Sequence, residues 1–264
     1  MEQNKISRRN FLRVAGASAT AAAMGGLVPA ASAAGIKDLW SVDLQILATS
    51  DTHGKFDPWD YAANKADASG SVAQQATAIK ENRTKTTLVV DAGDTIQANS
   101  AELFLNDDVH PMIAAQNAIG YDVYVTGNHE YNYGMATLEK VLSQQKAKVL
   151  TGNVYSPEGK PLADGYTIIK KGGVKIGFFG LETPETQTKT NPALIKGLTF
   201  LTDSTETTIW QNAQAQVDAL KAAGADVVVC LAHLGVDDSS VPYRSYDLYE
   251  KVTGLDFIID GHSH

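Results

Sequence analysis

The sequence predicts an α/β fold, in which helices cover the faces of β-sheets and polar residues gather at strand ends. Two patterns lead to this prediction. From about residue 39 onward, short apolar runs of β type alternate with longer stretches of helical periodicity. Five of the apolar runs also end within one or two residues at Gly, Asp, Asn or His.

The expected strands are short and largely apolar. The run at 87–90 has an unbroken apolar character, which is typical of a strand buried on both faces. The segment Lys171-Gly172-Gly173 predicts a hairpin with a glycine turn between two further strands. In chain order, we expect strands at 44–49, 87–90, 122–126, 148–151, 166–170, 174–179, 226–232 and 255–259.

Four segments have the periodicity or the boundary residues of helices. Pro111 suits the first turn of one helix, and Gly120 lies just past its end. Ser204 or Thr205 is placed to cap the last of the four. We expect these helices at 72–82, 111–119, 135–146 and 206–223.

Length and charge limit the possible functions. The chain has 264 residues, which is long for one domain but too short for two ample ones. Its formal net charge is −8, and no run of Lys or Arg follows the N-terminal segment, which argues against a nucleic-acid polymer as partner. A small anionic substrate remains compatible with this charge, because bound metal ions dominate the local field in such sites.

The N-terminal segment has the pattern of an export signal. Arg8 and Arg9 precede an Ala- and Gly-rich apolar stretch at 14–28, and Ala31-Ser32-Ala33 supplies the small residues of a cleavage site. The stretch is too short and too weakly hydrophobic for a stable membrane span. Residues 1–33 resemble a twin-arginine signal, although an ordinary secretory signal or an N-terminal anchor is the alternative. We therefore expect an exported protein of the periplasm, cell envelope or medium, which meets the twin-arginine export machinery.

The single cysteine excludes an intramolecular disulfide framework. Cys230 lies inside the apolar run Val227-Val228-Val229-Cys230-Leu231, and no positive group adjoins it in sequence. Free cysteine is commonly a small buried hydrophobe, so we interpret Cys230 as a core residue rather than a nucleophile.

Carboxylate, amide and imidazole side chains follow the expected strands. Because loops at the carboxyl ends of strands in open α/β sheets converge on one crevice, these side chains are expected to meet. Imidazole and carboxylate are standard ligands of Zn, Mn and Fe, and an Asn can add a carbonyl oxygen. The candidate metal ligands are Asp51, His53, Asp94, Asn128, His233, His262 and His264.

The same residues carry a family resemblance. Asp51-x-His53, Gly93-Asp94, Gly127-Asn128-His129-Glu130, His233 and Gly261-His262-Ser263-His264 resemble, in order and strand placement, the calcineurin-like metallophosphoesterase superfamily. This resemblance implies a four-layer αββα sandwich at 39–264 and a centre of two divalent ions (Zn, Mn, Fe or Co). Gly93-Asp94-Thr95-Ile96-Gln97 and Asn128-His129-Glu130-Tyr131 are similar to its branch of exported 5′-nucleotidases and 2′,3′-cyclic-nucleotide 2′-phosphodiesterases (3′-nucleotidases).

The resemblance also implies roles for the individual side chains. Asp51, His53 and His264 would hold one ion, Asn128, His233 and His262 the other, and Asp94 would bridge them. The metal pair would activate a water for attack on the phosphorus of a nucleotide ester. His129 would stabilise the transition state or protonate the leaving oxygen.

One position departs from the 5′-nucleotidase pattern. Asn132 stands where those relatives usually have an Asp that pairs with the imidazole of His129. Asn can orient the ring but favours imidazolium less than a carboxylate does. Asn132 therefore favours a 2′,3′-cyclic-nucleotide phosphodiesterase/3′-nucleotidase. The alternatives are a 5′-nucleotidase or UDP-sugar hydrolase, a thiosulfohydrolase of the same fold, and a non-catalytic exported metal-binding protein.

Residues beside these motifs have plainer interpretations. His110 is expected in a surface loop, and Glu130 is expected to have a structural duty rather than that of a base. Asp91 has two possible roles, support of a ligand or a turn acceptor. Four aromatic residues are expected near the rim of the site, where they either stack on a base or cover the core; they are Trp59, Tyr61, Tyr131 and Tyr133.

The position of the last ligand carries a further expectation. His264 is the final residue, and family members continue with more of the catalytic domain and with a second domain that grips the nucleoside. We therefore expect this sequence to be a fragment, because terminal ligands without supporting residues are loosely held.

Overall fold

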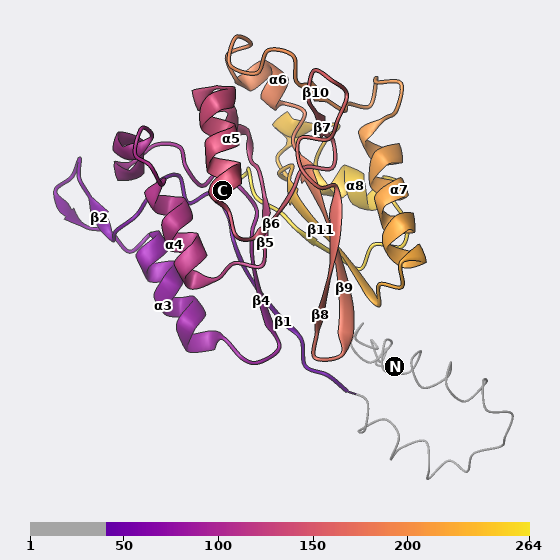
Figure 1. The fold of residues 1–264 in the computed structure, drawn as a ribbon, viewed down its shortest axis with the longest axis horizontal. Helices are drawn as coiled ribbons and strands as arrows, with labels where there is room; N and C mark the ends of the chain where they lie inside the picture. Colours follow the sequence, from indigo (N-terminus) through magenta and orange to yellow (C-terminus); the bar gives the residue numbers. More distant parts are fainter. Residues whose placement is uncertain (1–40) are drawn as a thin grey trace, which may run out of the picture. The chain divides into compact units, whose positions relative to one another are not determined.

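Two four-stranded sheets form the centre of the fold (Figure 1). The computed structural model describes residues 41–264, so the export signal expected at 1–33 lies outside the described residues. Within the described part, residues 44–264 form one compact unit. In the first sheet, all strands are parallel in the order β1 (Gln45–Thr49), β4 (Thr87–Asp91), β5 (Val123–Val125), β6 (Lys148–Leu150).

The second sheet has one antiparallel edge. Its order is β12 (Phe257–Ile259), β11 (Val227–His233), β9 (Val174–Glu182), β8 (Tyr166–Lys171). β12, β11 and β9 are parallel, whereas β8 pairs with β9 as the expected hairpin. All eight strands expected from the sequence are present, with ends shifted by at most three residues.

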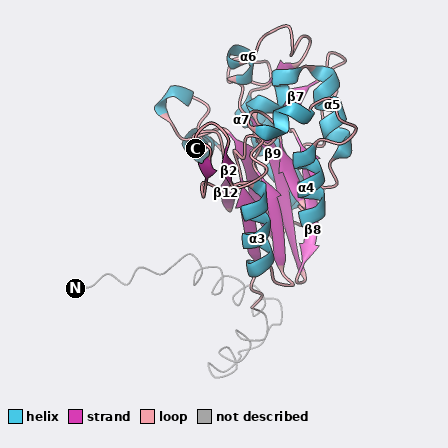
Figure 2. Cartoon of the chain, turned by 90° about the vertical axis from the view of Figure 1, so that its left-hand side faces the viewer, coloured by secondary structure: helices cyan, strands magenta, loops and turns pink. Residues whose placement is uncertain are grey.

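The sheets pack face to face, with helices on both outer sides (Figures 1 and 2). Val90 and Val125 of the first sheet share an apolar cluster with Phe178 and Leu231 of the second. The helices beside the first sheet are α3 (Val72–Asn82), α4 (Pro111–Ile119) and α5 (Met135–Gln144), and those beside the second are α7 (Ile209–Ala222) and α8 (Ser245–Lys251). These layers make the four-layer αββα sandwich that the resemblance implied.

The outer clusters show why each helix docks where it does. Ile79 of α3 packs with Val89 and Tyr124 of the first sheet. Val217 of α7 packs with strand residues of the second sheet, including the fully buried Cys230. The interpretation of Cys230 as a core residue is thus confirmed.

Capping residues set the helix boundaries. Ser71 and Gln74 form a reciprocal capping box at the start of α3. Gly120 ends α4 in the left-handed region, with φ of 82°. The predicted cap of α7 was wrong: Thr208, rather than Ser204 or Thr205, accepts the hydrogen bond at its first turn. The Thr205 hydroxyl is engaged with the backbone carbonyls of Thr202 and Thr207, so the helix begins later.

Several short elements have too few residues for a recognisable period. The sequence predicted neither α8 nor α6 (Thr186–Lys189). It also did not predict the short strands β2 (Trp59–Asp60), β3 (Lys65–Ala66), β7 (Val154–Tyr155) and β10 (Thr199–Phe200). It also missed the 3₁₀ turns η1 (Ser100–Phe104), η2 (Asn128–Tyr133) and η3 (Asp238–Ser240). Among residues 41–264, no helix has both the length and the apolar character needed to cross a membrane.

His110 corrects one expectation. It was expected in a surface loop, yet only 1% of the residue is exposed. It occupies the cap position of α4, and its backbone N–H donates to Oε1 of Gln144 on α5. Burial lowers the pKa of its imidazole to about 4. The side chain is therefore neutral at pH 7.

Candidate metal centre

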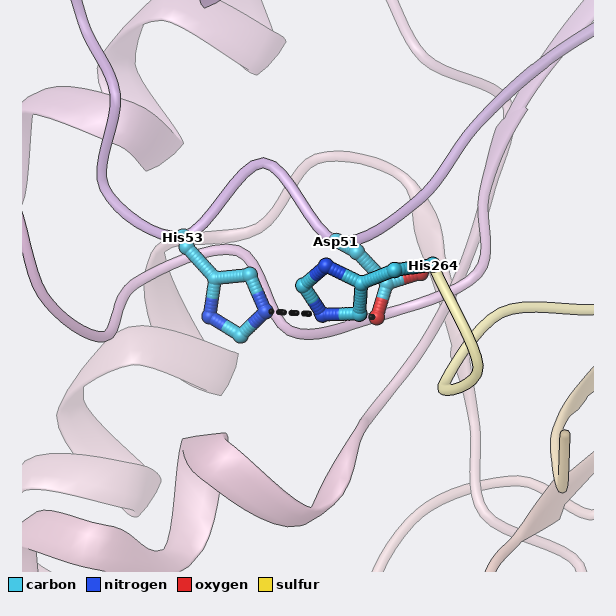
Figure 3. Close-up of side chains that lie close together, drawn as sticks. All are labelled: Asp51, His53 and His264. Carbon is cyan, nitrogen blue, oxygen red and sulfur yellow. Dashed lines mark hydrogen bonds and ion pairs between the residues drawn. The ribbon is translucent and has the colours of Figure 1, made fainter. Parts of the chain in front are cut away.

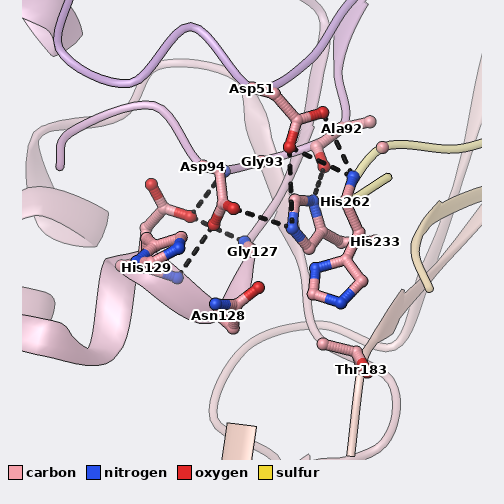
Figure 4. Close-up of polar contacts among 12 residues, drawn as sticks. Asp51, Ala92, Gly93, Asp94, Gly127, Asn128, His129, Thr183, His233 and His262 are labelled. Carbon is pink, nitrogen blue, oxygen red and sulfur yellow. Dashed lines mark hydrogen bonds and ion pairs between the residues drawn. The ribbon is translucent and has the colours of Figure 1, made fainter. Parts of the chain in front are cut away.

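The polar residues at the strand ends meet at one edge of the two sheets (Figure 4). β1 and β4 lead into the loops that carry Asp51 and Asp94, and His233 is the last residue of β11. Three groups of side chains have ligand atoms within 4.8 Å of one another: Asp51, His53 and His264 in the first, Asp94, His233 and His262 in the second, and His53, Asp94 and His129 in a third that overlaps both. Six of the seven predicted ligands therefore fall into two adjacent triads.

The loops reach this arrangement through unusual backbone conformations. The φ angles of Asp51, His53, Asp94 and His262 are 50°, 46°, 56° and 81°, in a region that non-glycine residues seldom adopt. Backbone hydrogen bonds between loops fix them, for example from His53 N to Asp94 O at 2.9 Å. Such conformations persist where the surrounding structure enforces them and cluster at functional sites.

The first triad brings two imidazoles and a carboxylate together (Figure 3). Nε2 of His53 lies 2.9 Å from Nε2 of His264, which is 3.7 Å from Oδ1 of Asp51. The two nitrogens face each other, as they do when imidazoles share a cation. His264 is the most exposed of the three, with 62% of its side chain accessible.

Asp94 belongs to the second triad and also approaches His53 of the first. Its Oδ2 is 3.0 Å from Nε2 of His233 and 3.9 Å from Nε2 of His53. Burial opposes ionisation of Asp94, but the neighbouring imidazole of His233 outweighs it and lowers the pKa of the carboxyl to about 2. Asp94 is therefore an anion within reach of both triads, which is the position of a bridging ligand.

Asn128 lies beside the second triad (Figure 4). It is 4% exposed, and its Oδ1 accepts no hydrogen bond from the residues that the structure describes. A buried amide oxygen without a donor is costly unless a cation or water satisfies it. The preceding Gly127 leaves room for this arrangement, because a Cβ there would collide with Oδ1 of Asp94. Figure 4 shows the Asn128 amide beside Asp94 and the ring of His262.

Three of the histidines are held by their other ring nitrogen. Nδ1 of His53 lies 2.8 Å from Oε1 of Gln97, and Nδ1 of His233 lies 2.6 Å from the carbonyl oxygen of Ala92. Nε2 of His262 lies 3.1 Å from Oε2 of Glu185. An oxygen acceptor requires a proton on that nitrogen, so when the ring is neutral the other nitrogen carries the lone pair that would bind an ion. The donor set and its support thus fit a pair of divalent ions.

Glu130 has the contacts of a structural acceptor. Its carboxylate accepts hydrogen bonds from the backbone N–H groups of Asp94, Thr95, Ile96 and Gly127 at 2.6–3.2 Å. Burial raises its pKa to about 7, whereas these amides favour the carboxylate. Glu130 therefore ties the loop after β4 to the loop after β5.

Asp91 supports the same loop from within β4. It accepts hydrogen bonds from Gly93 N at 3.1 Å and from the hydroxyls of Thr95 and Thr49. Burial raises the pKa of Asp91 to about 6. Of its two expected roles, the contacts favour that of a turn acceptor beside Asp94.

His129 lies beside the first two triads and forms the third group with His53 and Asp94. Its backbone N–H donates to Oδ1 of Asp94 at 2.8 Å, and its ring centroid is 5.2 Å from that of His53. Nδ2 of Asn132 is 2.7 Å from Nδ1 of His129, and the Thr190 hydroxyl donates to Oδ1 of Asn132 at 3.3 Å. Burial lowers the pKa of His129, so the ring is neutral with its proton on Nε2.

The four aromatic residues have different positions. Tyr131 is 1% exposed and packs against Phe200, so it covers the core. Tyr133 donates to Glu102 at 3.0 Å. Trp59 and Tyr61 are exposed and line a shallow surface pocket together with Asp57 and Pro58, which precede β2. None of the cluster residues lines this pocket.

The sequence of the chain is similar to those of known phosphoesterases. A family model described as calcineurin-like phosphoesterase matches residues 44–264. The chain is 33% identical over 248 residues to the trifunctional nucleotide phosphoesterase protein YfkN of Bacillus subtilis, covering 84% of this chain and 17% of that protein. It is also 33% identical over 248 residues to the 2′,3′-cyclic-nucleotide 2′-phosphodiesterase/3′-nucleotidase of Salmonella typhimurium, covering 85% and 37%. The chain thus spans well under half of either relative.

Solved structures of phosphoesterases and nucleotidases also have a similar fold. The crystal structure of calcineurin-like phosphoesterase YfkN from Bacillus subtilis has a TM-score of 0.72 at 31% identity, covering 84% of this chain and 72% of that one. A 5′-nucleotidase precursor from Thermus thermophilus has a TM-score of 0.66 at 28% identity, covering 84% and 42%. The resemblance drawn from the motifs is confirmed. The chain belongs to the calcineurin-like phosphoesterase family.

Proposed function

We propose that this chain hydrolyses nucleotide phosphoesters at a two-metal centre, with a preference for 2′,3′-cyclic nucleotides and 3′-nucleotides. The observation that carries the proposal is the buried Asp94 carboxylate, which approaches both His53 of the first triad and His233 of the second. The calcineurin-like phosphoesterase family uses a dinuclear metal centre, and the donor set supports such a centre here.

We assign one ion to Asp51, His53 and His264, the other to Asn128, His233 and His262, and Asp94 to both. When bound, a pair of divalent ions supplies charge neutralisation for phosphoryl oxygens and acidifies a water nucleophile. The assignment uses every predicted ligand once, apart from the bridge. Two separate structural Zn sites would usually need four protein ligands each, or eight in total. This centre offers seven, because both ions would share Asp94. The smaller number favours a catalytic centre over a purely structural one.

His129 has the role of a hydrogen-bond donor in this proposal. Because Asn132 donates to its Nδ1, the proton of the neutral ring is on Nε2. An N–H at the edge of the cluster can donate to a phosphoryl oxygen as charge develops, or to the leaving oxygen. A neutral donor does not need imidazolium, so the role persists well above the ordinary histidine pKa.

The substrate class rests on Asn132 and on the relatives. Relatives named 2′,3′-cyclic-nucleotide 2′-phosphodiesterase/3′-nucleotidase are 31–33% identical to the chain, whereas snake venom 5′-nucleotidases are 28–29% identical. A sulfate thiohydrolase, SoxB, shares the fold at 20% identity, which supports the fold alone. The 5′-nucleotidase or UDP-sugar hydrolase, the thiosulfohydrolase and the non-catalytic metal-binding protein are therefore the alternatives to test.

Export through the twin-arginine route to the periplasm, cell envelope or medium belongs to the proposal. Its support is the Arg8-Arg9 segment at 1–33. Changing both arginines to Lys should abolish translocation of a fused reporter that must fold before export. Continued export would favour an ordinary secretory signal, and retention of the reporter on membranes would favour an N-terminal anchor.

A substrate panel on the purified chain tests the activity. The panel comprises 2′,3′-cyclic AMP, 3′-AMP, 5′-AMP, a UDP-sugar, a thiosulfonate conjugate and an aryl phosphate, with Mn, Co or Zn added. Elemental analysis of the same sample counts bound ions. We expect the highest kcat/KM with 2′,3′-cyclic AMP and two ions per chain. Two bound ions without hydrolysis of any substrate would refute the catalytic proposal, and a preference for 5′-AMP would refute the substrate class.

A further inference from the structure

Two residues at the ends of α6, Glu185 and Lys189, contact the ring of His262 from outside the cluster. Nε2 of His262 lies 3.1 Å from Oε2 of Glu185, the residue before α6. The other oxygen of Glu185, Oε1, lies 3.1 Å from Nζ of Lys189 at the end of α6. The three side chains therefore form a chain of contacts from the protein surface to the cluster: Lys189 to Glu185 to His262.

The contact with Glu185 determines which nitrogen of His262 can bind an ion. A carboxylate can only accept, so the proton of the neutral ring lies on Nε2. Nζ of Lys189 is 3.5 Å from the same nitrogen, which is the longer and weaker contact. Nδ1 is then left with the lone pair, and a His262 nitrogen lies within 4.8 Å of ligand atoms of Asp94 and His233.

The backbone of His262 is fixed separately. Its N–H donates to both carboxylate oxygens of Asp51 at 3.1 Å, and its φ of 81° lies in the left-handed region. The ring can still rotate about its side-chain bonds, and among the described residues Glu185 is the carboxylate that contacts it. Glu185 is 13% exposed in its side chain and Lys189 43%, so this pair lies at the border between the cluster and solvent.

Glu185 is well suited to this contact. Burial raises its pKa, but hydrogen bonds from Ser240 and Lys189 outweigh the effect and leave the pKa below its ordinary value. Because Lys189 contacts Oε1, Oε2 is available to accept the hydrogen bond from Nε2–H of His262. Such a carboxylate raises the basicity of the ring and fixes its orientation.

We propose that Glu185 is the positioning residue of His262, and that Lys189 in turn positions Glu185. The pair fixes the Nε2–H tautomer of His262, so that Nδ1 keeps the lone pair that would bind the second ion. The inference rests on the proposed metal centre and adds the residues that tune one half of it. Neither residue is expected to touch the reacting phosphorus.

Metal affinity provides the first test. Glu185→Ala, Glu185→Gln and Lys189→Met are compared with wild type by dialysis against graded Zn²⁺ buffers and elemental analysis. Glu185→Ala should weaken one of two sites by about 10- to 100-fold. Glu185→Gln should weaken it less, because its amide oxygen still accepts, and Lys189→Met least. Glu206→Gln, which removes an exposed carboxylate before α7, is the matched control and should leave both sites unchanged.

The tautomer provides a second test that needs no metal. Imidazole ¹⁵N shifts of His262 in the metal-free protein should show Nε2–H in wild type and a mixture of tautomers in Glu185→Ala. Unfolding midpoints confirm that each variant is folded. An unchanged tautomer, or equal loss from both metal sites, would overturn the inference. If wild type binds fewer than two ions, the proposed function fails, while the ¹⁵N shifts still decide the role of Glu185.

Discussion

Nδ2 of Asn132 lies 2.7 Å from Nδ1 of His129, and this contact decides what the imidazole can do. Thr190 donates to Oδ1 of Asn132, so the amide points its N–H₂ group at the ring. The ring nitrogen must then accept, which places the proton on Nε2. In a chain with Asp at this position, the carboxylate would accept from Nδ1 and would favour imidazolium.

Asn132→Asp should reverse this arrangement. The new carboxylate stabilises imidazolium, so the pKa of His129 should rise by about one unit or more. In wild type the Nε2–H donor persists at high pH, whereas in the variant it is lost as the pH rises through the new pKa. NMR titration of the metal-free protein measures the pKa, and kcat/KM against pH measures the loss of rate on the basic side. An unchanged or lower pKa would show that the Asn132 contact does not control the ring.

Thr190→Val is a milder version of the same test. It removes the hydroxyl that orients Asn132 and introduces no charge. The pKa of His129 should change by less than in Asn132→Asp, while the tautomer becomes mixed because the amide is free to turn. A shift as large as that of Asn132→Asp would indicate a general disturbance of the loop.

Asp94→Asn should remove both metal binding and activity. The amide is neutral and nearly isosteric, so its Oδ1 can still accept from His129 N while the bridging charge is lost. We expect fewer than two ions per chain and a fall of at least about 10³-fold in kcat/KM, since catalysis depends on two clamped ions. Asp218→Asn, on the exposed side of α7, is the control. Retention of two ions by Asp94→Asn would argue against a bridging role.

The sequence predicted the strands and the candidate ligands because both depend on local rules. An apolar run followed by Asp94 or His233 identifies a strand end, and parallel strands bring such ends together. The supporting contacts do not follow such rules. Glu185 reaches His262 across 77 positions of sequence, and nothing in its immediate neighbours indicates this pairing. Gln97 is the last residue of the motif Gly93-Asp94-Thr95-Ile96-Gln97, but its contact with His53 depends on how two loops pack.

Two predictions from the sequence were wrong, one because of packing and the other because of hydrogen bonds within a turn. A histidine before a proline is typical of a loop, yet the packing of α4 against α5 buries His110. Ser204 and Thr205 are both good helix caps, but the hydroxyl of Thr205 bonds to its own turn, and Thr208 caps α7 instead. Local propensity shows which residues can form a loop or a helix cap, and the contacts made in the folded chain decide which of them do.

Glu130→Gln should destabilise the metal-free protein. The carboxylate accepts from four backbone N–H groups, and the amide group of Gln would turn two donors toward them. A buried donor left without its acceptor costs about 1–3 kcal/mol, so a loss on the order of 3 kcal/mol in the free energy of unfolding is expected. Urea denaturation in chelator measures it. Glu81→Gln on the exposed side of α3 is the control, and equal stability of both variants would contradict the structural role.

His110 should make the stability of the protein depend on pH. Burial lowers its pKa from 6.5 to about 4, so between these values the unfolded chain binds a proton that the folded protein does not. The free energy of unfolding should therefore fall as the pH drops from 6.5 to 4, by at most about 3 kcal/mol from this residue. Other groups titrate in the same range, so the relevant quantity is the difference between wild type and a variant without the imidazole.

His110→Leu is that variant. Neither ring nitrogen of His110 has a hydrogen-bond partner among the described residues, so the substitution removes no side-chain hydrogen bond from the native structure. At pH 7, where the imidazole is neutral in both folded and unfolded chains, the two proteins should differ by less than about 1.5 kcal/mol. At pH 4.5 the variant should be the more stable by about 2 kcal/mol relative to that baseline, because Leu has no proton to bind on unfolding. Urea denaturation at both pH values, in chelator, measures the difference. If the difference in free energy of unfolding is the same at pH 7 and pH 4.5, His110 is protonated in the folded protein or open to water. Burial then does not lower the pKa of its imidazole.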